Sequence, residues 1–172
     1  MKKWIGAICS GLAGVLTLIF LAMPAFVLDY GAFGKDKYSG YKLLSTKDFA
    51  EADTAIGWYR IFAWILIVLA VVMIVIAVLQ ILNNLNVVKM PAILDKVGML
   101  GLVALAIVAV LTLLATFGIR WEFLDLAKDW GIKGDSLKEF KDRLVVGVSI
   151  WFVVIANIVT AVCANVFGRK AK

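Results

Sequence analysis

Four long apolar runs dominate this chain and constrain its fold more than any other feature. They cover approximately residues 4–28, 61–82, 97–119 and 144–167, and none of them contains Asp, Glu, Lys or Arg. An α-helix needs about 20 residues to cross the hydrocarbon core of a bilayer, so each run is long enough. A transmembrane β-barrel would show short segments of alternating polarity instead. The sequence therefore predicts an all-α membrane protein, a four-transmembrane-helix bundle.

The composition also points to lipid as the solvent. Hydrophobic residues make up 63% of the 172 residues, whereas soluble domains contain about 45–50%. Lys2 and Lys3 stand before the first run, as in a secretory signal peptide. That run is longer than the roughly 7–15 apolar residues of a signal peptide, and the stretch around Pro24 lacks small residues at both cleavage positions. We therefore expect the first run to be a retained span.

The connections between the runs define a single membrane domain, residues 1–172. Connections 29–60 and 120–143 are long and polar, whereas connection 83–96 is short and contains Pro91. This order predicts two helical hairpins joined by an inner turn, with a long outer loop at the tip of each hairpin.

The distribution of charge predicts the orientation. The two termini and the inner turn together carry seven basic residues and one acidic residue, whereas the two long loops carry eleven of each. The long loops hold more Lys and Arg by number, but the density of these residues is higher on the side of the termini. The positive-inside rule then places both termini in the cytoplasm. The net charge of +6 lies on that side, so we expect no nucleic-acid partner.

Tryptophan and asparagine add two further expectations. Four tryptophans lie near the outer ends of the runs, which is typical of an aromatic belt at a membrane interface and less typical of an aromatic ligand cage. They are Trp58, Trp64, Trp121 and Trp151. No asparagine begins a glycosylation sequon, which favours a bacterial plasma membrane.

The residue types argue against an enzyme. The chain contains no histidine, which excludes imidazole acid–base catalysis and imidazole metal ligands. Ser10 and Ser149 have no suitable base within the apolar runs, where Lys is absent. Cys9 and Cys163 both lie in apolar runs, so no disulfide framework is expected in the loops. We expect neither catalysis nor a cofactor.

Small residues recur at helical spacing in three of the runs. Lipid provides no hydrophobic drive between helices, so close helix–helix contacts use small residues. The candidates for helix packing are Gly6, Ser10 and Gly14, then Ala63, Ala70 and Ala77, and finally Ala156, Thr160 and Ala164. Packing within one bundle is the favoured interpretation, and a self-association face, giving a homo-oligomer, is the alternative.

A few polar residues lie inside the runs. Asn157 and Asn165 are eight positions apart on one helix face, and Gln80 lies near the inner end of the second run. They predict either interhelical hydrogen bonds or the lining of a polar path. We favour hydrogen bonds, because proton-coupled transporters and charge-selective pores usually carry a charged residue at membrane depth.

The outer loops contain signals for ordered structure. Glycines and aromatic residues alternate in 29–41, which predicts a small hairpin or a turn-rich segment. Ser45 with Asp48, and Ser136 with Glu139, resemble helix capping boxes. The two long connections, 29–60 (loop 1) and 120–143 (loop 3), are therefore predicted to form a small ordered extracytoplasmic cap.

Residues 121–130 form an amphipathic pattern at the start of the last loop. Glu122, Asp125 and Asp129 share one face. Carboxylates of this kind suit Ca²⁺ or another cation, but the solvated face of an interfacial helix is the favoured interpretation.

The layout is similar to that of claudin-type tetraspans, with cytoplasmic termini, a long first loop and a short inner turn. The first loop departs from that family's Trp–Gly-Leu-Trp–Cys–Cys signature because it contains no cysteine, so the resemblance is one of topology. A tetraspan scaffold that contacts a partner protein or a second copy through its outer loops is the leading hypothesis. The alternative is a subunit of an oligomeric channel or small-solute transporter, lined by the polar face of the fourth span.

Overall fold

The computed structural model describes residues 2–47, 53–89, 91 and 93–168, and it is mostly helical. Four of its helices are long and apolar enough to cross a membrane. They are α1 (Lys2–Leu21), α3 (Asp53–Asn84), α4 (Ile93–Asp129) and α6 (Val148–Gly168). The chain is therefore a membrane-embedded protein, in agreement with its apolar composition.

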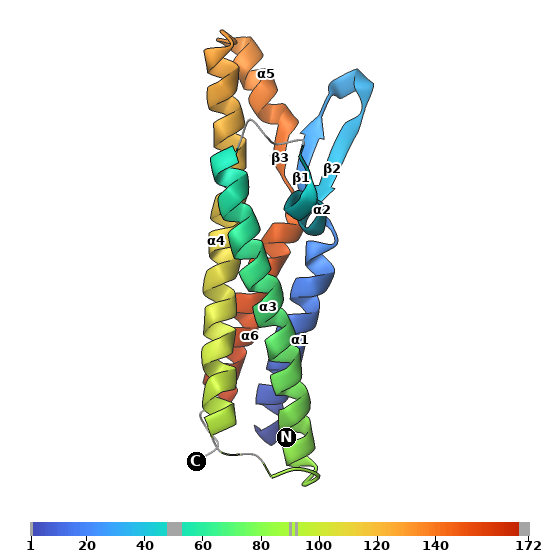
Figure 1. Cartoon of the computed structure of the whole chain (residues 1–172), viewed down its shortest axis with the longest axis vertical. Coiled ribbons are helices and arrows are strands. Elements are labelled where there is room, and N and C mark those ends of the chain that lie inside the picture. Colours follow the sequence, from blue (N-terminus) through green and yellow to red (C-terminus); the bar gives the residue numbers. More distant parts are fainter. Residues whose placement is uncertain (1, 48–52, 90, 92, 169–172) are drawn as a thin grey trace.

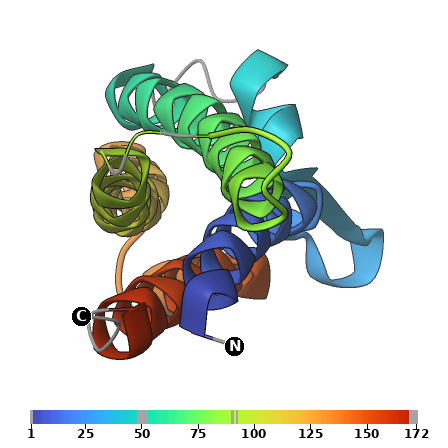
Figure 2. The same ribbon diagram turned by 90° about the horizontal axis from the view of Figure 1, so that it is seen from below.

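The four long helices form a bundle in which each helix packs against two neighbours (Figures 1 and 2). Helix α1 contacts α3 and α6, and α4 contacts the same two helices. The side chains between them form an apolar core that includes Leu66, Met73, Leu105 and Val153. Apolar residues such as Val68 remain exposed on the outside, as expected for helices that are solvated by lipid.

A three-stranded antiparallel sheet lies at one end of the bundle (Figure 1). The strands are β1 (Pro24–Asp29), β2 (Lys35–Ser39) and β3 (Leu144–Val146), in the order β2-β1-β3. Strand β1 pairs with β2 through a turn that contains the 3-10 helix η1 (Gly31–Phe33), and with β3 in the register Val27 to Val145. The segment between α1 and α3 and the segment between α4 and α6 therefore share one sheet.

Two short helices accompany the sheet. Helix α2 (Gly40–Ser45) follows β2, and helix α5 (Asp135–Arg143) leads into β3. We call this part of the molecule, with its sheet and short helices, the sheet end. The opposite end, where α1 begins, α6 ends and α3 connects to α4, is the terminal end (Figure 1).

The first span is shorter than predicted. Helix α1 ends at Leu21, whereas Pro24–Asp29, part of the predicted span 4–28, forms strand β1. Proline cannot donate a backbone hydrogen bond to a continuing helix, and the bulky Phe26 and β-branched Val27 favour a strand. Because the run is apolar throughout, hydropathy did not indicate that the helix ends and a strand begins within it.

The predicted limits of the other spans also differ from the helices. Helix α3 begins at Asp53, eight residues before the predicted span 61–82. The predicted fourth span, 144–167, begins instead with strand β3, and helix α6 starts at Val148. Apolar strand residues are indistinguishable from membrane residues by hydropathy alone, which explains the difference at β3. The early start of α3 has another cause, because its first eight residues include Asp53 and Arg60 and are helical.

The predicted interfacial helix over residues 121–130 is not a separate element. Helix α4 continues without interruption from Ile93 to Asp129, so the third span and this amphipathic segment form one helix of 37 residues. Gly131, with a φ of +81°, follows the end of this helix. Between residues 93 and 129 there is no proline to break it.

Of the two predicted helix caps, the one at Ser136 is wrong, whereas the one at Ser45 was expected to begin a following helix that includes residues outside the described part of the chain. Ser45 is the last residue of α2, and the N-cap of that helix is Ser39, whose side chain accepts a hydrogen bond from the Lys42 amide. Asp48, the predicted partner of Ser45, lies outside the described residues. Ser136 lies inside the first turn of α5, where Gly134 occupies the N-cap position.

Candidate functional site

A second apolar core holds the sheet end together and is distinct from the core between the spans. It combines side chains from the sheet, α2 and the adjoining ends of α3 and α4. Phe26 from β1, Leu43 from α2 and Tyr59 from α3 are fully buried in it. We call the sheet, α2, α5 and these helix ends the sheet-end module.

Two residues of α3 fix helix α2 to the bundle. The guanidinium of Arg60 donates hydrogen bonds to the carbonyls of Leu43 and Thr46, at the C-terminal end of α2. The buried Tyr59 hydroxyl donates to the Gly40 carbonyl at 3.2 Å. A cation at a helix C-terminus satisfies carbonyls that have no partner within the helix, so Arg60 both caps and positions α2.

Two residues of helix α4 bind the backbone of other helices in a similar way. Arg120 donates from Nη2 to the Lys141 carbonyl in α5 at 3.0 Å. Both carboxylate oxygens of Glu122 accept from the Ala55 amide, at 3.0 and 3.1 Å, in the first turn of α3. A carboxylate at a helix N-terminus satisfies an unpaired amide and complements the helix dipole.

The junction between β3 and α6 requires glycine. A Cβ added to Gly147 would lie 2.1 Å from the carbonyl oxygen of Pro24. The Gly147 amide donates to the Ala25 carbonyl at 2.7 Å, and the Ser149 hydroxyl donates to the Pro24 carbonyl at 2.6 Å. The start of α6 is therefore held directly against the start of β1.

The β1–β2 turn is fixed by several contacts. Asp29 accepts a hydrogen bond from the Gly31 amide at 2.9 Å and pairs with the Lys35 ammonium at 2.6 Å. The hydrogen bond from Lys35, followed by that from Gly31, lowers the pKa of Asp29, so the carboxylate is ionised at neutral pH. Gly31 and Gly34 both have positive φ, at +63° and +106°. Phe33 of this turn is almost fully exposed, with 95% of its surface accessible.

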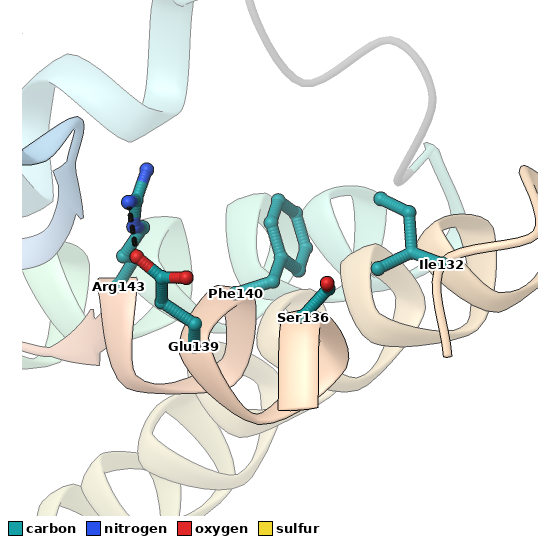
Figure 3. A pocket seen from close by; sticks show the side chains of 5 residues that line it. All are labelled: Ile132, Ser136, Glu139, Phe140 and Arg143. Carbon is teal, nitrogen blue, oxygen red and sulfur yellow. Dashed lines mark hydrogen bonds and ion pairs between the residues drawn. The ribbon is translucent and has the colours of Figure 1, made fainter. Parts of the chain in front are cut away.

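A small hollow lies against α5 and has a volume of about 210 Å³. Ile132, Ser136, Glu139, Phe140 and Arg143 line it (Figure 3). Arg143 donates from Nη2 to Glu139 at 2.6 Å. The hollow therefore combines two apolar side chains, Ile132 and Phe140, with an ion pair.

The structure places Asn157 and Asn165 in different environments. Asn157 is fully buried, and its Nδ2 donates to Thr17 Oγ1 of α1 at 2.9 Å and to the Val153 carbonyl at 2.8 Å. Its Oδ1 has no partner among the described residues. Asn165 donates to the Ala161 carbonyl of its own helix.

Gln80 lies near the terminal end of α3. Its Nε2 donates to Asp95 Oδ1 at 3.2 Å, and its buried Oε1 has no partner within the described residues. A Cβ added to Gly98 would approach Gln80 Nε2 to 3.0 Å. The hydrogen bonds of Gln80, Asn157 and Asn165 therefore go to different partners: Asp95 for Gln80, Thr17 and Val153 for Asn157, and Ala161 for Asn165.

The small residues predicted for helix packing mostly lie in contacts between helices. Ser10, Ala63, Ala70 and Ala77 are buried, and a Cβ on Gly14 would lie 2.5 Å from the Ala70 carbonyl oxygen. Gly6 lies beside Gln80. On α6, Thr160 and Ala164 are buried and Ala156 is half-buried.

The three carboxylates considered for a cation have separate partners. Glu122 binds the Ala55 amide, and Asp125 pairs with Lys128 at 2.6 Å. Asp129 is exposed at the end of α4. Within the described residues, no group of three or more His, Cys, Asp or Glu side chains is placed to hold a metal ion.

Four features of the sheet end were not predicted from the sequence: Phe33, Arg60, Arg120 and the hollow against α5. Phe33 carried a signal, because it stands between two glycines in a turn, where an apolar side chain has little to pack against. Arg60 and Arg120 each stand at the edge of an apolar run, which suggests a boundary but no particular partner.

Comparisons with known proteins found no match for this chain. No protein-family model matches it, and no curated protein or solved structure matches it either. Its function is therefore inferred from the geometry of the chain alone.

Proposed function

We propose that this protein is a non-enzymatic membrane scaffold that binds another protein through its sheet-end module. The observation that carries the proposal is the set of contacts that join the sheet-end module to the long helices. The module joins β1 and β3 from two different connections in one sheet, and Arg60, Arg120 and Glu122 fix it to the long helices. A surface that is ordered before binding loses less conformational entropy on association.

In this proposal the sheet end is extracytoplasmic and both termini are cytoplasmic. Seven basic residues and one acidic residue lie in the termini and the α3–α4 connection, which favours that side as the cytoplasm. Four tryptophans on the sheet-end halves of α3, α4 and α6 are exposed, as in an aromatic belt. They are Trp58, Trp64, Trp121 and Trp151. We place the protein in a bacterial plasma membrane as two helical hairpins with an extracytoplasmic cap.

The channel or transporter alternative is less well supported. Asn157 is hydrogen bonded to Thr17 and Val153, and Gln80 donates to Asp95. Bonds of this kind contribute roughly 0.6–2 kcal/mol each to helix association in membranes. They favour a packing role for these side chains over the lining of a polar path.

Photo-crosslinking tests the scaffold proposal. A photoreactive amino acid would be incorporated at Lys128 or Lys133, both exposed in the module, and at the lipid-facing Val68 as a control. We expect one discrete protein adduct, of the same identity from both module positions, and only lipid adducts from Val68. If the module positions also gave only lipid or water adducts in native membranes, the proposal would be wrong.

Thiol labelling tests the orientation independently. Cys9 and Cys163 would be replaced by Ala, and a single cysteine placed at Lys128 or at Lys89. We expect a membrane-impermeant maleimide to label Lys128→Cys in intact cells, and to label Lys89→Cys only after permeabilisation. The reverse pattern would invert the proposed topology.

A further inference from the structure

We propose that the outer face of the sheet lies in the headgroup layer of the membrane, with its valines against lipid and Lys37 bound to a lipid phosphate. The outer face is the side of the sheet that points away from the apolar core of the sheet-end module. It carries Val27, Asp29, Lys35, Lys37 and Val145. This lipid contact goes beyond the proposed scaffold function, and it does not depend on which side of the membrane the sheet end occupies.

The alternation of side chains along the strands defines this face. Successive side chains of a strand point to opposite faces of a sheet. In β1, Phe26 is buried in the module core and Leu28 packs against that core, so Val27 between them points the other way. The register pairs Val27 with Lys37 of β2 and with Val145 of β3. Two valines and one lysine therefore form a single row across the outer face.

This row continues the lipid-facing surface of α6. That surface begins at Val148, which is 66% exposed, and includes Phe152 and Ile155, four and then three residues further along the helix. Val145 is also exposed, and so is Met23 just before β1. Hydrogen bonds hold the start of α6 against the start of β1, and residues 144–168 contain no charge. An uncharged, apolar surface therefore extends from the span onto the sheet.

The length of α6 places the row close to the headgroups. Its apolar segment, Val148–Phe167, has 20 residues and is about 30 Å long at 1.5 Å per residue, which equals the thickness of the hydrocarbon core. The headgroup layer adds about 5–8 Å on each side. Val145 is three residues before Val148, a distance of at most about 10 Å along an extended chain. Strands β1 and β3 lie directly above α1 and α6 (Figure 1), so the row is within reach of this layer.

The charges on and beside the outer face leave one cation unmatched. Asp29 pairs with Lys35 at 2.6 Å, and Arg143, just before β3, pairs with Glu139 at 2.6 Å. Lys37 is exposed, and among the described residues no ion pair includes it. The row that continues the lipid-facing surface therefore carries a positive charge that is available to an anion.

A phospholipid satisfies both parts of the row. The aliphatic stem of a lysine lies along apolar surface while its ammonium reaches the polar layer, and an ammonium binds phosphate as a point charge. The neighbouring valines would meet the glycerol region and the first methylenes of the same lipid. An acidic soluble protein could pair with Lys37, but it could not follow the apolar surface down onto α6. The continuity of that surface therefore favours lipid as the occupant.

Fluorescence quenching tests the position of the row. In a background without Cys9 and Cys163, a single Val145→Cys would be labelled with bimane and the protein placed in nanodiscs. We expect strong quenching by a lipid with a nitroxide on its headgroup and weak quenching by acrylamide in the water. Lys128→Cys should show the reverse, and Val68→Cys should respond to a nitroxide deep in the acyl chain. The thermal midpoint verifies that each labelled protein is folded, and Val148→Cys provides a second position at the boundary.

A charge reversal tests the phosphate contact. Adding Lys37→Glu, which repels phosphate, should remove roughly half or more of the headgroup quenching at the Val145 position and increase quenching by acrylamide. Lys133→Glu is the matched control, because it makes the same change of charge at another exposed lysine. It should leave both kinds of quenching unchanged.

Three outcomes would overturn the inference. If acrylamide quenched the Val145 probe as strongly as the Lys128 probe, the sheet face would lie in water. If neither quencher reached it, protein would cover the face. If Lys37→Glu had no more effect than Lys133→Glu, Lys37 would not bind phosphate. The scaffold function is tested separately by the photo-adducts at Lys128 and Lys133, so it would stand or fall independently.

Discussion

The contacts of Asn157 distinguish a role in helix packing from a role in lining a polar path. It is fully buried and connects α6 to α1 through a 2.9 Å hydrogen bond to Thr17. Its position in an apolar run was visible in the sequence, and so was its shared face with Asn165. The sequence did not show that Thr17 is its partner. A single threonine in another apolar run does not indicate which helix will pack against it.

A double-mutant cycle measures this contact. Asn157→Ala and Thr17→Val, made singly and together, should give a coupling free energy of about 0.6–1.7 kcal/mol in reversible unfolding from mixed micelles. Asn165→Ala should show almost no coupling to Thr17, since its side chain donates to the Ala161 carbonyl of its own helix. A coupling near zero for Asn157 would mean that the buried bond does not contribute to bundle stability.

Among the elements, the long helices could be predicted, whereas strands β1 and β3 could not. A run of about 20 apolar residues without charge has almost no stable alternative to a helix in lipid. Strand β1 follows α1 after only two residues, Ala22 and Met23, and continues its hydrophobicity, so no polar segment marks the change. Pro24 was the available signal, because proline often stands one to three residues beyond a helix end.

The N-terminus of α3 depends on a residue from another helix. Glu122 of α4 accepts the Ala55 amide with both oxygens. Its position on the polar face of the amphipathic segment suggested a solvated or cation-binding carboxylate. Its role as a cap depends instead on the N-terminus of α3 lying next to it. Tertiary contacts of this kind leave no local pattern in the sequence.

Removing this cap should destabilise the bundle. We expect Glu122→Ala to lower the free energy of unfolding by about 0.5–2 kcal/mol, as for other lost N-terminal caps. Asp125→Ala is the matched control: its ion pair with Lys128 is exposed and should contribute no more than about 1 kcal/mol. Equal effects in thermal unfolding would argue against the capping role. Added Ca²⁺ should not raise the midpoint of the parent protein.

At the scale of the whole molecule, the sheet joins two segments that are far apart in the sequence. Strand β1 follows the first long helix, and β3 precedes the last one. The sequence predicted a hairpin or turns in the first connection, but the pairing of β1 with β3 joins residues more than 115 positions apart. Register across such a distance is set by the packing of the helices beneath it.

An engineered disulfide tests that register. In a background without Cys9 and Cys163, Val27→Cys with Val145→Cys should form an intramolecular disulfide, since paired antiparallel residues have Cα atoms about 4.5–5.5 Å apart. It should stabilise the protein by about 2–4 kcal/mol, measured by unfolding with and without reductant. Lys35→Cys with Val145→Cys should not crosslink, because β1 lies between β2 and β3. A disulfide only in the second pair would mean a different strand order.

The length of α4 has a mechanical consequence. At 1.5 Å per residue, its 37 residues make a rod of about 55 Å, compared with a hydrocarbon core of about 30 Å. Transmembrane helices tilt to match bilayer thickness over a range of about 0–40°. A change in tilt of about 10° moves one end of such a rod by about 10 Å relative to the other. A thinner or thicker bilayer would therefore move the sheet end of α4 sideways much further than the part of α4 that lies in the hydrocarbon core.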